Sequence, residues 1–164
     1  MEEKKSSILK GKKGLIVGIA NERSLAWGIA NCIHQHGGEL ALTYQNDALK
    51  KRIVPLATKV NSNNIYEFDI QNYEKTPSFF ENLSQDFGNL DFIVHAVAFS
   101  DKEELKGDYV DTTKNNFLNT MEISCYSFTA LIREALPFMN EKANFLTLSY
   151  YGCLLYTSDA ADDA

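Results

Sequence analysis

Short apolar segments rich in β-branched residues alternate along this chain with longer segments of helical periodicity. This alternation is typical of βαβ units, in which parallel strands are buried on both faces by the connecting helices. We therefore predict an α/β fold with a Rossmann-like, doubly wound parallel sheet, truncated after the fifth strand. The predicted strands are Lys13–Val17, Glu39–Tyr44, Asn64–Glu67, Phe92–Ala96 and Asn144–Ser149. The predicted helices cover about Leu25–His36, Asp47–Val60, Tyr73–Asp86 and Asn115–Phe138.

Length and composition indicate one domain. The 164 residues are 45% hydrophobic, which is enough for one packed core and too little for two ordinary domains. Gly37 and Gly38 should end the first helix, and Pro137 should close the last one. We expect the core to include the aromatic residues on helical apolar faces: Trp27, Phe79, Phe80, Phe87, Phe117 and Phe128.

Charge and cysteine content exclude several classes of function. The formal net charge of −6 leaves no basic stripe for a nucleic acid. The three cysteines lack a C-x-x-C pairing, so we expect neither a disulfide framework nor a metal site. The charged N-terminus has no apolar signal region after it, and no apolar run approaches the ~18 residues of a membrane span. We therefore expect a cytoplasmic protein without membrane contact.

The first predicted strand ends abruptly at Gly18, and an amphipathic helix follows from Ser24 and Leu25. A residue without a Cβ lets the backbone approach a pyrophosphate, which free N–H groups and the positive end of the helix dipole neutralise. Ser24 adds a hydroxyl donor where the helix begins. A single glycine turn that departs from G-x-G-x-x-G is weak evidence, and a tight turn that only allows close helix packing is the alternative.

Polar side chains follow the other predicted strands as well. Gln45, Asp69 and the segment His95–Ser100 each come directly after a strand, so one crevice at the carboxyl ends can collect them. Gln45 stands where dinucleotide-binding folds place an acid for the adenosine ribose. A neutral amide there favours NADH over NADPH, although nearby lysines leave room for a phosphate. The alternatives are a solvated loop amide at Gln45, a turn-capping aspartate at Asp69 and a backbone-bonded histidine at His95.

Several motifs, taken together, resemble a known family. They are Gly18-x5-Ser24-x3-Gly28, Leu42–Asp47, Phe68–Ile70, His95–Phe99, Gly107–Val110, Ile123–Phe128 and Leu146–Gly152. In order and separation they resemble the enoyl-[acyl-carrier-protein] reductases, a divergent branch of the short-chain dehydrogenases, over about residues 9–152. The resemblance implies an enzyme that uses NADH to reduce the trans-2 double bond of an enoyl chain on acyl carrier protein, in the last step of fatty-acid elongation. It also implies a homotetramer assembled through Asn115–Phe138 and the helix that follows in the family.

The resemblance assigns cofactor contacts to particular residues. Those residues are Gly18, Ser24, Leu25, Gln45, Asp69, Ile70 and Val97. The Asp69 carboxylate would accept a hydrogen bond from the exocyclic amine of adenine, and Val97 would pack on the ribose and nicotinamide side. Ala98 replaces a glycine of the family pattern, which adds a methyl group where backbone and cofactor approach closely.

The same resemblance places Ser100 on the substrate side and makes Tyr150 the first of two active-site tyrosines. The second tyrosine falls at Ala160, and the family lysine falls past residue 164. Because loss of an oxyanion donor lowers a rate by about 10²–10³, we expect this chain to be inactive alone. We expect a C-terminally truncated dinucleotide-binding domain over residues 1–152, followed at 153–164 by a non-native or disordered acidic tail.

Two other functions stay open. Another short-chain dehydrogenase acting on a carbonyl or alcohol has the same early motifs, and a Tyr-x3-Lys spacing in place of Tyr-x6-Lys would indicate it. A nucleotide-binding module without catalysis would need only the strand-end residues.

Overall fold

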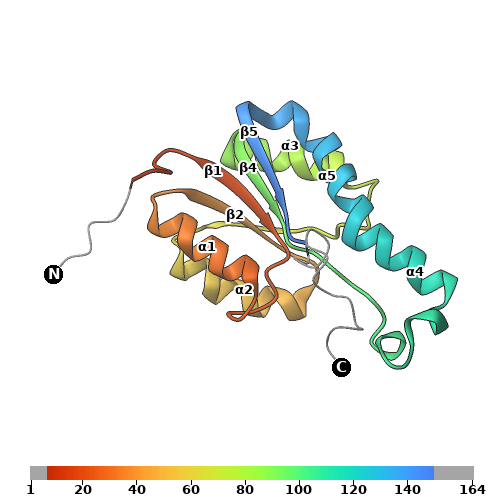
Figure 1. Ribbon diagram of the computed structural model, residues 1–164. Coiled ribbons are helices and arrows are strands. Elements are labelled where there is room, and N and C mark those ends of the chain that lie inside the picture. The colour runs from red at the N-terminus through yellow and green to blue at the C-terminus, as the bar shows by residue number, and fades with distance from the viewer. Residues whose placement is uncertain (1–6, 150–164) are drawn as a thin grey trace.

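The sheet is parallel throughout and has a doubly wound order. The computed structural model describes residues 7–149, and its five strands lie in the order β3-β2-β1-β4-β5 (Figure 1). They are β1 Lys13–Val17, β2 Glu39–Tyr44, β3 Asn64–Glu67, β4 Leu90–His95 and β5 Met139–Thr147. Each neighbouring pair is parallel, which confirms the predicted Rossmann-like α/β class. Tyr150 and the predicted tail lie outside the described residues.

Helices cover both faces of the sheet. They are α1 Leu25–Gln35, α2 Asp47–Lys59, α3 Thr76–Phe87, α4 Lys114–Met121 and α5 Ser127–Ala135. Figure 1 shows α1 and α2 on one face, with α3 and α5 on the other. Successive β1 side chains divide between two cores, because Ile16 packs with the α1 and α2 residues while Leu15 and Val17 pack with those of α3 and α5. Among residues 7–149, no helix is long and apolar enough to cross a membrane.

Local sequence determines where α1 and α2 begin and where α1 ends. The Ser24 side chain accepts from the Trp27 N–H at 3.4 Å, and the Asn46 side chain accepts from the Leu49 N–H at 3.1 Å, so both N-termini are capped. After α1, Gly37 has a φ of +87°, a conformation that favours glycine. The predicted helix stop is confirmed.

The long helix predicted at Asn115–Phe138 is present, with one irregular turn inside it. A π-helical turn at Glu122–Tyr126 separates α4 from α5. The Ser127 hydroxyl donates to the Ile123 carbonyl at 2.6 Å, and such side-chain bonds compete with the backbone ladder and bend helices. The predicted helix is therefore present over its expected length, but it contains a π-helical turn that the sequence did not predict and that faces the site described below.

Several boundaries and one core residue also differ from expectation. The α-helix α5 gives way to a 3-10 turn at Leu136–Phe138, because Pro137 has no N–H to continue it. β4 and β5 begin earlier than predicted, and α3 begins later, at Thr76, with Pro77 in its first turn. Phe117 is 45% exposed instead of buried, since α4 buries only Asn116.

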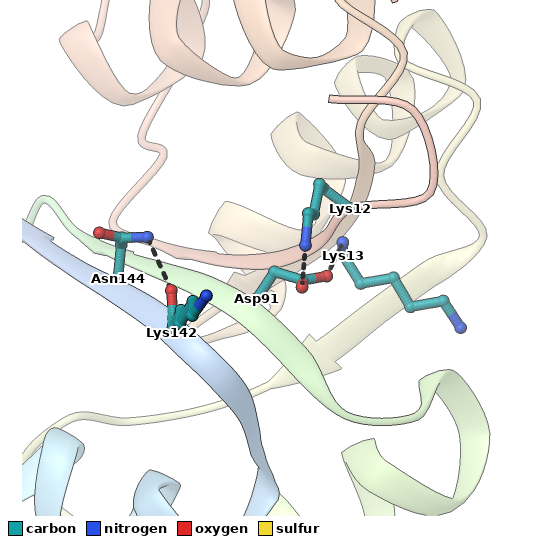
Figure 2. Close-up of polar contacts among 5 residues, drawn as sticks. All are labelled: Lys12, Lys13, Asp91, Lys142 and Asn144. Carbon is teal, nitrogen blue, oxygen red and sulfur yellow. Dashed lines mark hydrogen bonds and ion pairs between the residues drawn. The ribbon is translucent and has the colours of Figure 1, made fainter. Parts of the chain in front are cut away.

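The amino ends of β1 and β4 are joined through Asp91 (Figure 2). Asp91 Oδ1 accepts from Lys12 Nζ at 2.8 Å, and Oδ2 accepts from the Lys13 N–H at 2.9 Å. Burial alone raises the pKa of Asp91, but these hydrogen bonds outweigh it and lower the pKa below its ordinary value. Next to this cluster β5 is irregular, with Lys142 at a φ of +62° and its carbonyl accepting from Asn144 Nδ2 at 3.1 Å (Figure 2).

Candidate functional site

The carboxyl ends of four strands open into one cleft. It has a volume of about 450 Å³ and is lined by the segments that follow β1, β2, β3 and β4. The predicted cofactor residues along it are Gly18, Gln45, Asp69, Ile70 and Val97. Two others, Ser24 and Leu25, do not line it. A crevice at this edge is where doubly wound sheets bind ligands.

Gly18 lies where β1 and β4 come closest at this edge. Its φ is +108°, and an added Cβ would lie 2.2 Å from the Ala96 carbonyl oxygen, so only glycine fits. The Ala96 N–H donates to the Val17 carbonyl at 2.8 Å and holds the two strand ends together. The neighbouring strand thus requires this glycine, and close approach of a phosphate stays a prediction.

The turn between β1 and α1 is organised by Asn21. Its Oδ1 accepts from the Arg23 N–H at 2.8 Å, and its carbonyl accepts from the Ser24 hydroxyl at 2.7 Å. The Ser24 hydroxyl is therefore already engaged as a donor to Asn21 and as the cap of α1. Leu25 is 75% exposed at the start of the helix. Neither residue reaches the cleft in this conformation, because the cap holds Ser24 against its own turn.

The side chains that line the cleft within residues 7–149 carry no positive charge. Along the described lining there is no basic side chain, and Asp69 is the one carboxylate. An anionic ligand would be neutralised by N–H groups after Gly18 and by the dipole of α1. Asp69 Oδ1 accepts from the Gln71 N–H at 3.1 Å, as the turn-capping alternative expects, and no group among residues 7–149 is hydrogen-bonded to its other oxygen.

The wall after β4 is held from behind by the π-helical turn. The Phe99 N–H donates to Ser124 Oγ at 3.1 Å, and that hydroxyl donates to the Phe99 carbonyl at 3.3 Å. Val97 and Ala98 lie in this wall, and the same turn contributes Ile123 to the cleft. The π-helical turn thus fastens and completes one side of the site.

His95 is structural and does not line the cleft. It is 1% exposed, and its ring contacts two hydroxyls, with Nδ1 3.0 Å from Thr147 Oγ1 and Nε2 2.8 Å from Ser127 Oγ. Burial lowers the pKa of His95, so the ring is neutral at pH 7. The expected structural role of this histidine fits the geometry, but the partners of its two ring nitrogens are hydroxyls on α5 and β5.

Ser100, the predicted substrate residue, lies in a second cleft. This cleft has a volume of about 380 Å³ and lies between α4 and the loop after β4. Ser100 Oγ accepts from Asn116 Nδ2 at 3.0 Å and from the Thr120 hydroxyl at 3.1 Å. Its substrate role stays a prediction, as does the catalytic role of Tyr150, which is outside the described residues.

Among the lining residues that sequence reasoning did not assign to the main cleft are Gln71, Asn119 and Ile123. Ile123 and Asn119 lie on helical segments, where the rule that polar residues follow strands does not apply. Gln71 follows two predicted site residues directly and could have been found by extending that rule. Within the described part of the chain, no three His, Cys, Asp or Glu side chains gather as metal ligands do.

Known proteins match the chain across these strand-end segments. A family model described as "Enoyl-(Acyl carrier protein) reductase" matches residues 18–161. The chain is 46% identical to the enoyl-[acyl-carrier-protein] reductase [NADH] of Rickettsia bellii and 48% identical to enoyl-[acyl-carrier-protein] reductase [NADH] 1 of Rhizobium meliloti. Each alignment covers 90% of this chain, but 56% and 54% of those relatives. The chain thus spans about half the length of the curated relatives it matches.

A solved structure shows the same arrangement. The crystal structure of the Anaplasma phagocytophilum enoyl-(acyl-carrier-protein) reductase in complex with NAD has a TM-score of 0.85 and 50% sequence identity. That match covers 90% of this chain and 56% of the crystallised one.

Proposed function

Because the chain belongs to the enoyl-(acyl carrier protein) reductase family, we propose that its strand-end cleft binds NADH. One observation carries the proposal: residues that follow four different strands line the same cavity. They are Gly18, Gln45, Asp69 and Val97. Its volume of about 450 Å³ falls within the range of about 300–1,000 Å³ found for small-molecule and cofactor sites.

The residues present suit the parts of the dinucleotide. Backbone N–H groups after Gly18 and at the start of α1 would hold the two phosphates. Ser24 and Leu25 would join them only if the turn before α1 rearranged, because Asn21 engages the Ser24 hydroxyl. Gln45 would bond the adenosine ribose hydroxyls, and its neutral amide favours NADH. The unengaged Asp69 oxygen would accept from the adenine amine beside Ile70. Val97 would pack on the nicotinamide side.

The proposed reaction is reduction of the trans-2 double bond of an enoyl chain on acyl carrier protein. Bound NADH supplies the hydride for the β-carbon of the thioester. The enolate charge that would build up on the carbonyl oxygen needs a hydrogen-bond donor, and a proton taken up at the α-carbon would complete the reduction. We place Tyr150 and Ser100 on the substrate side. Ala160 stands where the family resemblance expects the second tyrosine, so we propose that this chain binds NADH without appreciable turnover.

The proposal also covers the oligomeric state and the cellular location of the protein. We propose a cytoplasmic homotetramer for a full-length form, with α4 and α5 at an interface between subunits. Three apolar side chains of α4 support this, because Phe117, Leu118 and Met121 are each more than 40% exposed.

A titration of the 164-residue chain tests the proposal. The single tryptophan, Trp27, lies in the first turn of α1, the helix whose start would face the phosphates. NADH binding should therefore quench the tryptophan fluorescence and raise the fluorescence of the nicotinamide. We expect saturable binding that is tighter for NADH than for NADPH. Asp69→Asn should weaken it, whereas Glu81→Gln, at an exposed carboxylate of α3, should not. A flat titration of a chain with intact circular dichroism would overturn the proposal.

A further inference from the structure

An amide pair bridges two walls of the cleft. Gln71 lies in the turn after β3 and Asn119 lies on α4, and Gln71 Nε2 donates to Asn119 Oδ1 at 3.2 Å. Both residues line the strand-end cleft. They are 48 positions apart in the sequence, so this contact exists only because the fold brings the two walls together.

The bond leaves hydrogen-bonding groups for a ligand. An amide side chain has an NH2 group with two donors and an oxygen that accepts twice. Within the described residues, Gln71 Oε1 and Asn119 Nδ2 make no other hydrogen bond. If both amides are turned over, the pair still keeps one oxygen and one NH2 group. In either orientation it offers an acceptor and a donor at the cleft.

We infer that Gln71 and Asn119 together read the edge of an adenine ring and make the cleft selective for adenine dinucleotides. The inference rests on the proposed function, which places adenine beside Asp69 and Ile70, directly before Gln71. Adenine presents an amine donor next to a ring nitrogen that accepts, and amide side chains pair with both groups. Here the two groups come from two side chains, which their mutual bond holds together.

The arrangement discriminates against a closely related base. Hypoxanthine has a carbonyl oxygen in place of the adenine amine, so it accepts where adenine donates. That oxygen would meet the Asp69 carboxylate and the Gln71 oxygen with no proton to share, which weakens binding. A pair that only braced the turn after β3 against α4 would not distinguish the two bases.

The experiment compares NADH with reduced nicotinamide hypoxanthine dinucleotide, its deamino form, on the 164-residue chain. The unaltered chain should prefer NADH. Gln71→Met and Asn119→Leu keep the approximate shapes and should each lower that preference about tenfold, within the range for one bidentate base contact. The double variant should lower it no further, because either change breaks the same pair. Gln85→Met, at an exposed position of α3, is the matched control and should keep the full preference.

Circular dichroism and unfolding midpoints identify variants that lose the fold. Where Asn119→Leu disturbs α4, Asn119→Asp replaces it, because it keeps the shape and exchanges the NH2 donor for a carboxylate oxygen that can only accept. If NADH binds and the folded variants keep the full preference, the adenine-reading role is overturned while the proposed function stands. If the unaltered chain binds neither dinucleotide, the proposed function fails and this inference falls with it.

Discussion

His95 Nε2 lies 2.8 Å from Ser127 Oγ, and this contact joins the end of β4 to the start of α5. The Ser127 hydroxyl donates its only proton to the Ile123 carbonyl at 2.6 Å, so its oxygen accepts from His95. The ring is neutral, so its Nδ1 accepts from the Thr147 hydroxyl. A directed chain of hydrogen bonds therefore runs from β5, through β4, to the π-helical turn that lines the cleft.

Removal of Ser127 Oγ should leave a buried N–H without a partner. We predict that Ser127→Ala lowers the free energy of unfolding by about 1–3 kcal/mol, the usual cost of such a group. Urea unfolding measures this, and Ser78→Ala on the exposed side of α3 should change it by less than about 0.5 kcal/mol. Nitrogen chemical shifts should show His95 as the Nε2–H tautomer, and the opposite tautomer would contradict the direction of the chain.

Stability should fall as the solution becomes mildly acidic. Burial lowers the pKa of folded His95 below the value of about 6.5 that it has when unfolded. Below about pH 6.5 the unfolded chain therefore binds a proton that the folded chain does not, and stability is lost at up to about 1.4 kcal/mol per pH unit. Asp91 contributes to the pH dependence of stability only in more acid solution, because its pKa in the folded chain is lowered. Urea unfolding at about pH 7.5 and about pH 5.5 tests this. The loss should be smaller in His95→Gln, and equal stabilities of the unaltered chain would refute the prediction.

Two glycines of the same β1–α1 unit should respond oppositely to alanine. At Gly18 the new Cβ meets the Ala96 carbonyl oxygen at 2.2 Å, at a φ of +108°, so Gly18→Ala should cost at least about 2 kcal/mol and abolish NADH binding. At Gly28, inside α1, nothing lies within 4 Å of the added Cβ. Gly28→Ala should therefore stabilise the chain by about 0.5–1 kcal/mol. Paired unfolding and NADH titrations measure both, and tolerance of alanine at Gly18 would argue against the described turn.

The parts of the fold that sequence predicts well are those whose pattern is set by burial. Buried parallel strands such as β1 and β2 read as continuous apolar runs, so their positions are predicted correctly. The start of β5 reads Asn140-Glu141-Lys142, which has no apolar pattern because this part of the strand is exposed. The π-helical turn was missed for another reason: it shifts the backbone hydrogen bonds by one residue without ending the helix, and hydrophobic periodicity does not register such a shift.

The candidate site also has residues that the sequence predicts and residues that it does not. Sheet geometry alone predicts that residues after parallel strands share one edge, and Gly18, Gln45, Asp69 and Val97 do share it. Their contacts with NADH stay predictions. Ser24 is held away because Asn21 engages its hydroxyl, a local choice that the motif does not reveal. Asn119 reaches the cleft only through the placement of α4 beside the turn after β3, which no single-segment pattern encodes.

The irregularity in β5 offers a test of the backbone itself. Lys142 has a φ of +62°, which costs an L-residue about 1–2 kcal/mol, whereas glycine adopts it freely. The greater freedom of unfolded glycine offsets about 0.4–1 kcal/mol, so Lys142→Gly should raise the free energy of unfolding by about 0.5–1 kcal/mol. The bond from Asn144 is made to the Lys142 carbonyl, which the substitution keeps.

Two comparisons make the Lys142 result specific. Asn61 has a φ of +51°, and asparagine tolerates this region, so Asn61→Gly should gain less. Lys51→Gly, inside α2, should lose about 1 kcal/mol, because glycine is a poor helix former. Urea unfolding of the three variants gives the order. If Lys142→Gly destabilises the chain as Lys51→Gly does, the left-handed conformation at this point of β5 is wrong.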